Sequence, residues 1–159
     1  MSKPKNPGLM YRLIRKMNPK VAHRFNQGKP PAKFILLLTT TGRKSGLPRK
    51  TPLQFEEIEG KYYVSSGRGN AADWYKNILA NPQVEVQIQA RRFRGIAEPV
   101  TDPERLADFF ACRLKRSPFF IGLVMRLEGL PLRYNRSDLK RFSTNKAMVI
   151  IQPLSESEE

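Results

Sequence analysis

The chain has 159 residues and a hydrophobic fraction of 40%, values that suit one soluble domain with a core of its own. Its 29 lysine and arginine residues against 14 acidic residues give a formal net charge of +15, which favours polyanions, anionic lipids or phosphorylated small molecules as partners. A single cysteine, Cys112, and a single histidine, His23, exclude an intrachain disulfide and a His/Cys metal cluster, so we predict no metal site.

Targeting signals are missing from the sequence pattern. No apolar stretch reaches the ~18 residues of a membrane-spanning helix. The opening "MSKPKNPG" has no apolar run of the kind found in a secretory signal. We therefore expect a cytoplasmic protein.

Residues 7–27 predict one or two amphipathic helices, because apolar residues recur there at steps of three and four. Cations, among them Arg12, Arg15 and Lys16, occupy the other faces. Such a helix either packs on the domain or lies in an anionic interface at the inner face of the cell membrane. We expect residues 1–30 to form this segment and a linker, residues 31–153 the main domain, and residues 154–159 an acidic tail.

Six extended runs and three helices follow in chain order. The predicted strands are "FILLLTTT", "PRKTPLQFEEI", "GKYYVSSG", "QVEVQIQA", "RRFRGIAEPV" and "KAMVIIQP". The predicted helices lie in "GNAADWYKNILANP", in "DPERLADFFACRLKR" with Asp102 as its cap, and in "SPFFIGLVMRLEGLP". Most connections between strands are too short for parallel crossovers. The pattern therefore predicts an α+β, mainly β protein, an antiparallel barrel with short helices around it, and an open α+β sandwich is the alternative.

Two glycines bracket a basic connection between the first two strands, in "TTTGRKSGLPRKTPL". Gly42 and Gly46 permit positive φ, so that backbone N–H groups can turn toward one anion. Arg43, Lys44 and Arg49 add charged donors that suit phosphate or carboxylate. The connection is either a solvated hairpin turn or an anion-binding loop.

A second turn, "SSGRGNAADWYKN", repeats this chemistry before a predicted helix. The start of a helix carries partial positive charge and free N–H groups, which favour anions. We expect Asn70 to cap this helix, with Asp73 three residues later. Trp74, the only tryptophan, is either a core anchor or a flat surface for a ligand ring. The two turns together favour a planar ligand that carries a phosphate.

The two turns and the strands between them also resemble a known family. "TTTGRKSGLPRKTPL" followed by "YYVSSGRGNAADWYKNILANPQVEVQI" is similar to the deazaflavin-dependent nitroreductase family of split β-barrel flavin/deazaflavin oxidoreductases. The resemblance covers about residues 34–100. It implies a split β-barrel of antiparallel strands that binds coenzyme F420, a deazaflavin with a phosphate and an oligoglutamate tail. Such a tail would explain the cations of the first turn.

The resemblance also implies which residues contact the coenzyme. They are Arg43, Lys44, Ser45, Gly46 and Arg49 at the phosphate and acidic tail, Thr51, Pro52 and Leu53 along the ring, Ser65, Ser66, Gly67 and Arg68 in the second turn, and Trp74 and Asn77 closing the pocket. The implied reaction is hydride transfer from the reduced coenzyme to a quinone, an activated alkene or a nitro compound. Tyr134 is the candidate hydrogen-bond donor to this acceptor, and packing is the alternative role for its ring.

Two other functions remain open from the residues. The basic loop suits the phosphate of FMN as well as that of the deazaflavin. A net charge of +15 also supports non-specific nucleic-acid binding, although the sequence carries no recognised nucleic-acid motif, so we expect no specific nucleic-acid partner. A homodimer is left open.

Overall fold

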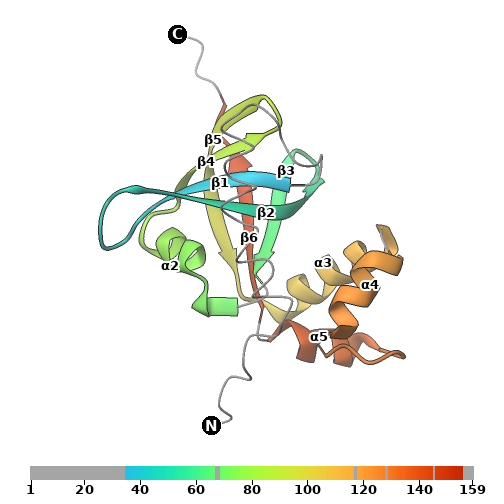
Figure 1. The fold of residues 1–159 in the computed structure, drawn as a ribbon. Helices are drawn as coiled ribbons and strands as arrows, with labels where there is room; N and C mark the ends of the chain where they lie inside the picture. Colours follow the sequence, from blue (N-terminus) through green and yellow to red (C-terminus); the bar gives the residue numbers. More distant parts are fainter. Residues whose placement is uncertain (1–34, 67–68, 117, 128, 145, 156–159) are drawn as a thin grey trace.

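The computed structural model describes residues 35–66, 69–116, 118–127, 129–144 and 146–155 (Figure 1). The predicted N-terminal segment, residues 7–27, lies outside this part of the chain, as do Gly67 and Arg68 of the second turn. Most of the acidic tail, residues 156–159, does so too.

Six strands close into one barrel, in the order β1-β2-β3-β6-β5-β4, and each pair of neighbours is antiparallel. The strands are β1 (Ile35–Thr41), β2 (Pro48–Ile58), β3 (Lys61–Ser66), β4 (Gln83–Ile88), β5 (Arg91–Val100) and β6 (Ala147–Pro153). Each one falls in a predicted run, so the predicted barrel is confirmed and the sandwich alternative is wrong. Closure gives each of these six strands a partner on both edges, which removes a site of aggregation.

The hairpins are tight because the chain takes left-handed conformations between strands. Glu59 and Gly60 join β2 to β3 with φ of 51° and 74°, which is the geometry of a two-residue hairpin turn. Gln89 has a φ of 53° between β4 and β5. These short turns fix the register of each pair, so the alternating side chains of each strand point alternately into and out of the barrel.

The helical elements are a short 3-10 turn η1 (Gly69–Ala71), α2 (Asp73–Ala80), α3 (Pro103–Arg116), α4 (Pro118–Leu127) and α5 (Arg136–Ser143). Asp102 caps α3 as predicted, because its carboxylate accepts a hydrogen bond from the Glu104 N–H at 3.1 Å. The predicted cap of α2 is wrong: η1 takes up Asn70, and Ala72 stands at the N-cap with no side-chain hydrogen bond.

The fifth helix, α5, was not predicted. Asn135 and Asp138 form a capping box at its start, each side chain accepting from the other residue's N–H at 2.9 and 3.0 Å. These two residues stand three apart in the sequence, which is the signal that pattern reasoning passed over.

Two apolar clusters lie on the two faces of the barrel wall. The barrel interior is filled by residues such as Leu36, Leu38, Val64 and Val86, with Trp74 and Ile78 of α2 closing one end. The outer cluster lies under α3, α4 and α5, which we call the helical unit. Strand β6 serves both clusters, since Val149 faces inward and Met148 and Ile150 face the helices.

The β1–β2 loop and α2 lie on one side of the barrel, and the helical unit lies on the other (Figure 1). Tyr63 of β3 stacks on Phe109 of α3 with ring centroids 5.7 Å apart. Glu56 of β2 pairs with Arg113 and Arg116 of α3 at 3.7 and 2.9 Å. None of the helices described is long and apolar enough to cross a membrane.

Candidate functional site

The β1–β2 loop is closed by its own backbone. The Gly42 N–H donates to the Leu47 carbonyl at 2.8 Å, and the Gly46 N–H donates to the Gly42 carbonyl at 2.8 Å. Gly46 has the positive φ that the sequence suggested, at 70°. Gly42 does not, and its importance lies elsewhere.

Gly42 is buried, and a side chain there would meet the rest of the loop. An added Cβ would come within 2.6 Å of Ser45 Oγ and within 3.2 Å of the Leu47 carbonyl oxygen. The missing side chain therefore leaves room for the Ser45 hydroxyl, which accepts from the Leu47 N–H at 3.2 Å and from Arg49 Nη2 at 3.4 Å. Glycine at position 42 thus sets the place of a polar group between two strands.

The side chain of Asn77 in α2 ties the loop to the barrel through hydrogen bonds. Its side chain is buried, with 3% exposed, yet both ends of its amide have partners. The Oδ1 atom accepts from the Arg43 N–H at 3.2 Å and from Arg43 Nη1 at 2.9 Å. The Nδ2 atom donates to Thr40 Oγ1, also buried, at 3.2 Å. Because a buried amide without partners is costly, this network ties the loop to the helix and to β1.

Arg43 is engaged within the chain. Its Nη2 atom pairs with Asp73 Oδ1 at 3.1 Å, in addition to its two bonds to Asn77. By contrast, Lys44, Arg49 and Lys50 are exposed and form no ion pair with any other residue in the described ranges. We call the connection and the first residues of β2, residues 42–50, together the loop; it presents three cations whose charge no carboxylate of the described chain neutralises.

The residues expected along the ring follow the loop on β2. Thr51, Pro52 and Leu53 are half-buried, and they pair across the sheet with Leu38, Leu37 and Leu36. Leu53 packs against the barrel interior. A half-buried strand that starts at a basic loop offers one apolar surface and one charged end.

The second turn is described only in part. Ser65 and Ser66 end β3 and pair with Met148 and Ala147 of β6. Trp74 is buried, with 7% exposed, and packs edge-on against Tyr75 at 6.1 Å. Its ring belongs to the barrel interior, so in this conformation it acts as a core anchor.

Tyr134 lies apart from the loop. It is 41% exposed, in the connection between α4 and α5, and Figure 1 places that connection on the side of the barrel away from the loop. The described chain thus brings the loop, the first residues of β2 and α2 together, and leaves Tyr134 outside that group.

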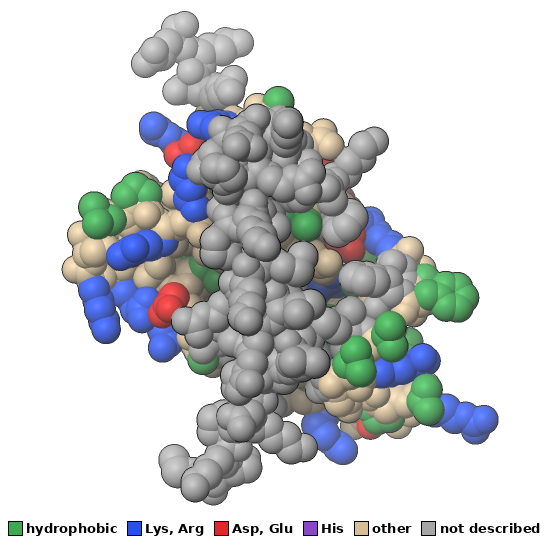
Figure 2. Space-filling model, in the orientation of Figure 1, with side chains coloured by type: hydrophobic (Ala, Val, Ile, Leu, Met, Phe, Trp, Pro, Cys, Tyr) green, Lys and Arg blue, Asp and Glu red, His purple; other side chains and the backbone are tan. Residues whose placement is uncertain are grey.

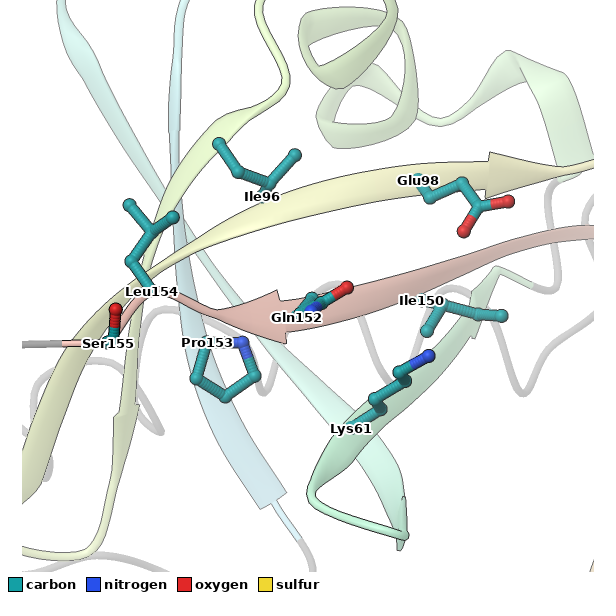
Figure 3. Close-up of a pocket in the computed structure, with 8 residues that line it drawn as sticks. All are labelled: Lys61, Ile96, Glu98, Ile150, Gln152, Pro153, Leu154 and Ser155. Atoms are coloured by element: carbon teal, nitrogen blue, oxygen red, sulfur yellow. The ribbon is translucent and has the colours of Figure 1, made fainter.

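A surface pocket of ≈ 480 Å³ lies elsewhere, on the outer wall of the barrel (Figure 3). Lys61, Ile96, Glu98, Ile150 and Leu154 are among its lining residues. None of the predicted cofactor residues lines it, so it is not the site that the sequence suggests. Among the described residues, no group of His, Cys, Asp and Glu side chains could hold a metal ion.

Sequence reasoning did not assign a site role to Lys50 or Asp73. Asp73 and Asn77 stand four apart, which places both side chains on one face of α2, toward Arg43. That spacing is visible in "DWYKN". The contact with Arg43, 34 residues before Asn77, is not visible in the sequence.

Comparisons with known proteins identify the family of the chain. The family model described as F420H(2)-dependent quinone reductase matches residues 9–132. The F420H(2)-dependent quinone reductase of Mycobacterium tuberculosis strain H37Rv is 36% identical over 97 residues, which cover 58% of this chain and 62% of that protein. The chain thus spans less than two thirds of the length of that relative.

Solved structures give the same fold. An F420-H2 dependent reductase (FDR-A) matches with a TM-score of 0.51 and 26% identity, over 76% of this chain and 95% of that one. A chain described as a domain-swapped dimer matches with a TM-score of 0.54 and 23% identity, over 89% of this chain and 98% of that one, and supports the fold alone. The split barrel and the resemblance to F420-dependent reductases are confirmed. Since the family model matches most of its residues, the chain belongs to the F420H(2)-dependent quinone reductase family.

Proposed function

We propose that this chain binds reduced coenzyme F420 and that a hydride passes from it to a quinone. The observation that carries the proposal is the β1–β2 loop, where Lys44, Arg49 and Lys50 have no carboxylate partner in the described ranges and Asn77 fixes the neighbouring backbone at Arg43. Family membership supports the same cofactor, and the relative from Mycobacterium tuberculosis carries quinone reductase in its name.

The residues of the loop fit the coenzyme's acidic end. Lys44, Arg49 and Lys50 supply positive charge, and the planar guanidinium of Arg49 suits a phosphate or a carboxylate. Ser45 adds a hydroxyl that Gly42 gives room to. The same donors suit the phosphate of FMN, so FMN is the alternative cofactor. The length of the acidic tail favours the deazaflavin, because one phosphate needs fewer cations than the loop offers.

The protein's part in the proposed reaction is to bind and to orient. When bound, the reduced deazaflavin supplies the hydride. Thr51, Pro52 and Leu53 would lie along the ring, while Arg43 and Asn77 hold the loop that positions the charged end. Ser65, Ser66, Gly67, Arg68 and Trp74 remain predicted contacts on the side of the second turn. No acid–base pair is needed for this chemistry.

Other parts of the proposal concern the acceptor and the assembly. Quinone is the proposed acceptor, and activated alkenes and nitro compounds are the competitors to compare with it. Tyr134 remains a predicted contact to the acceptor. A homodimer remains a prediction. A membrane contact through residues 7–27 also remains one, since those residues lie outside the described chain.

The cofactor is tested by parallel titrations of the full chain with F420 and with FMN, followed by fluorescence. We expect tighter binding of F420, and competition by added phosphate for both. Equal or tighter binding of FMN would overturn the cofactor assignment. A third titration with duplex DNA at physiological salt addresses the nucleic-acid alternative, for which we expect only weak, sequence-independent binding that rising salt removes.

The acceptor is tested by turnover. Oxidation of F420H2 is followed with a quinone, a nitro compound and an activated alkene at equal concentrations, and we expect the largest kcat/KM for the quinone. Wild type and Tyr134→Phe are compared with each acceptor. An unchanged kcat/KM in the variant would remove Tyr134 from the acceptor site but would leave the cofactor assignment intact.

A further inference from the structure

Helix α4 exposes one apolar stripe. Phe119, Leu123 and Leu127 are 92, 57 and 65% exposed, and they stand four residues apart, so that they lie along one face of the helix. Leu132 continues this exposed apolar stretch beyond the helix, at 76%. Contiguous apolar surface of this kind marks interaction sites in soluble proteins.

The opposite face of α4 is fixed to the protein. Ile121 and Met125 are buried in the outer cluster, as is Leu130 just after the helix, and a Cβ on Gly122 would lie 3.9 Å from Leu114 Cδ2 of α3. The stripe therefore cannot turn inward without removing these residues from the core. The helical unit holds its apolar stripe in solvent on a rigid support.

Cations border the stripe. The stretch 115–133 contains four cations and one acidic residue. Arg116 pairs with Glu56, whereas Lys115, Arg126 and Arg133 form no ion pair with another described residue. Figure 2 shows apolar side chains next to lysine and arginine over the helices. We propose that this face of α4 binds an anionic membrane surface, with Phe119 and the leucines entering the interface and the cations meeting lipid headgroups.

Charge decides between this occupant and two others. A second copy docked about a two-fold axis would bring the same cations face to face. Residues 1–34 contain nine lysine and arginine residues and no acidic residue, so the N-terminal segment carries the same sign as the border of the stripe. Anionic lipid is the partner whose charge is complementary and whose interior accepts apolar side chains. This inference goes beyond the proposed reductase function and does not depend on cofactor binding.

The test is co-sedimentation of the full chain with vesicles of phosphatidylcholine alone and of phosphatidylcholine mixed equally with phosphatidylglycerol. We expect binding to the anionic vesicles that falls with salt. Leu123→Gln/Leu127→Gln should lower the partition coefficient by about tenfold, because two leucines no longer enter the interface. Arg126→Glu/Arg133→Glu should lower it by a similar factor on anionic vesicles only.

A matched control separates the stripe from general surface apolarity. Leu79→Gln/Leu154→Gln changes two leucines that are 59 and 49% exposed outside α4, and its binding should equal that of wild type. Circular dichroism and light scattering on each variant report fold and mass. Equal binding to both kinds of vesicle, an equal loss in the control, or binding that both α4 variants leave unchanged would overturn the proposal. A fall in mass on Leu123→Gln/Leu127→Gln would instead assign the stripe to a second copy and overturn it as well.

Discussion

The β1–β2 loop and the helical unit are both rich in lysine and arginine, yet their cations have different surroundings. In the helical unit, carboxylates neutralise most of them: Arg116 meets Glu56 at 2.9 Å, and Arg136 meets Asp108 at 2.7 Å and Glu104 at 2.8 Å. In the loop, only Arg43 has a carboxylate partner among the described residues.

This difference shows that net charge and function are separate questions. The paired cations of the helical unit, such as Arg116 and Arg136, connect helices to one another and to the barrel wall. Lys44, Arg49 and Lys50 lie close to a backbone held by a buried amide and meet no carboxylate among the described residues, and so remain available to an anion from outside. Under the proposed function, the same residue type forms internal ion pairs in much of one region and binds a ligand in the other.

Removal of the amide that supports the loop should have the largest effect. Asn77→Ala leaves the Arg43 N–H, its guanidinium and Thr40 Oγ1 without their buried partner. We expect the free energy of unfolding to fall by about 2–3 kcal/mol and F420 binding to weaken with it. Urea denaturation measures the first and titration the second. Asn81→Ala, at the C-cap of the same helix, removes an exposed hydrogen bond from the Gln83 N–H at 3.1 Å, so it is the control and should cost less than about 1 kcal/mol.

If the loop is equally stable and binds equally well without Asn77, the amide is not its support. The contrast with the helical unit would then rest on the cations alone.

A pair of arginine variants sharpens the comparison directly. Arg49→Ala should weaken F420 binding by about 1–3 kcal/mol and leave the free energy of unfolding nearly unchanged, because its only described polar partner is the Ser45 hydroxyl at 3.4 Å. Arg116→Ala should do the reverse, with unchanged affinity and a small loss of stability, because it loses its bond to Glu56. Titration measures affinity and urea denaturation measures stability, and the two variants should show opposite effects on them. A loss of affinity in both variants would mean that overall charge attracts the coenzyme.

The room around Ser45 gives a smaller effect. Gly42→Ala places a methyl group 2.6 Å from Ser45 Oγ, so the hydroxyl must move, and we expect a loss of about 1 kcal/mol in stability. In a Ser45→Ala background the same change should cost less, by about 0.5–1 kcal/mol of coupling. Gly46→Ala, at a φ of 70° with nothing nearby, should cost about 1 kcal/mol through backbone strain and show no such coupling. Additive costs for Gly42 and Ser45 would show that the close approach is not what places the hydroxyl.

Alternation and turn residues favoured a barrel over the sandwich alternative, and the family resemblance implied the same fold. Strand β4 alternates Val84, Glu85 and Val86, and Glu59–Gly60 marks a turn, so local pattern and global fold agree there. Strand β6 is buried on both faces and has no alternation, but its apolar run between polar segments gave the same prediction. Helix α5 was not predicted because its mean hydropathy is low. The capping box of Asn135 and Asp138 is its clearest sequence signal.

The site could be predicted as a set of residues and not as a network. Glycine and cation spacing pointed to the loop, since those properties are local. The Asn77 amide bonds to Arg43 and Thr40 because α2 packs against β1. Residue spacing within one segment does not reveal how two distant segments pack. For the same reason, Gly42 was expected to turn the chain and is in fact needed for space.

The smallest effect we predict depends on pH and concerns the helical unit. The Glu104 carboxylate accepts hydrogen bonds from Lys140 and then Arg136, which together hold its pKa below the usual range. A carboxyl group whose pKa is lowered on folding stabilises the protein at pH values above its unfolded pKa, and this contribution is lost as the pH falls through the folded pKa. Wild type should therefore exceed Glu104→Gln in thermal midpoint at neutral pH, and the gap should close below about pH 4.

The gap should be small, because the Glu104 side chain is 55% exposed and water and salt screen its pairs. Glu57→Gln is the matched control: this exposed residue of β2 has no ion pair with another described residue, and its variant should follow wild type at every pH. F420 affinity should stay unchanged in both variants, since neither touches the loop. If the thermal midpoint of Glu104→Gln follows that of wild type from neutral pH to pH 3, Lys140 and Arg136 do not stabilise the helices through Glu104. The cations of the helical unit would then not have the structural role that distinguishes them from those of the loop.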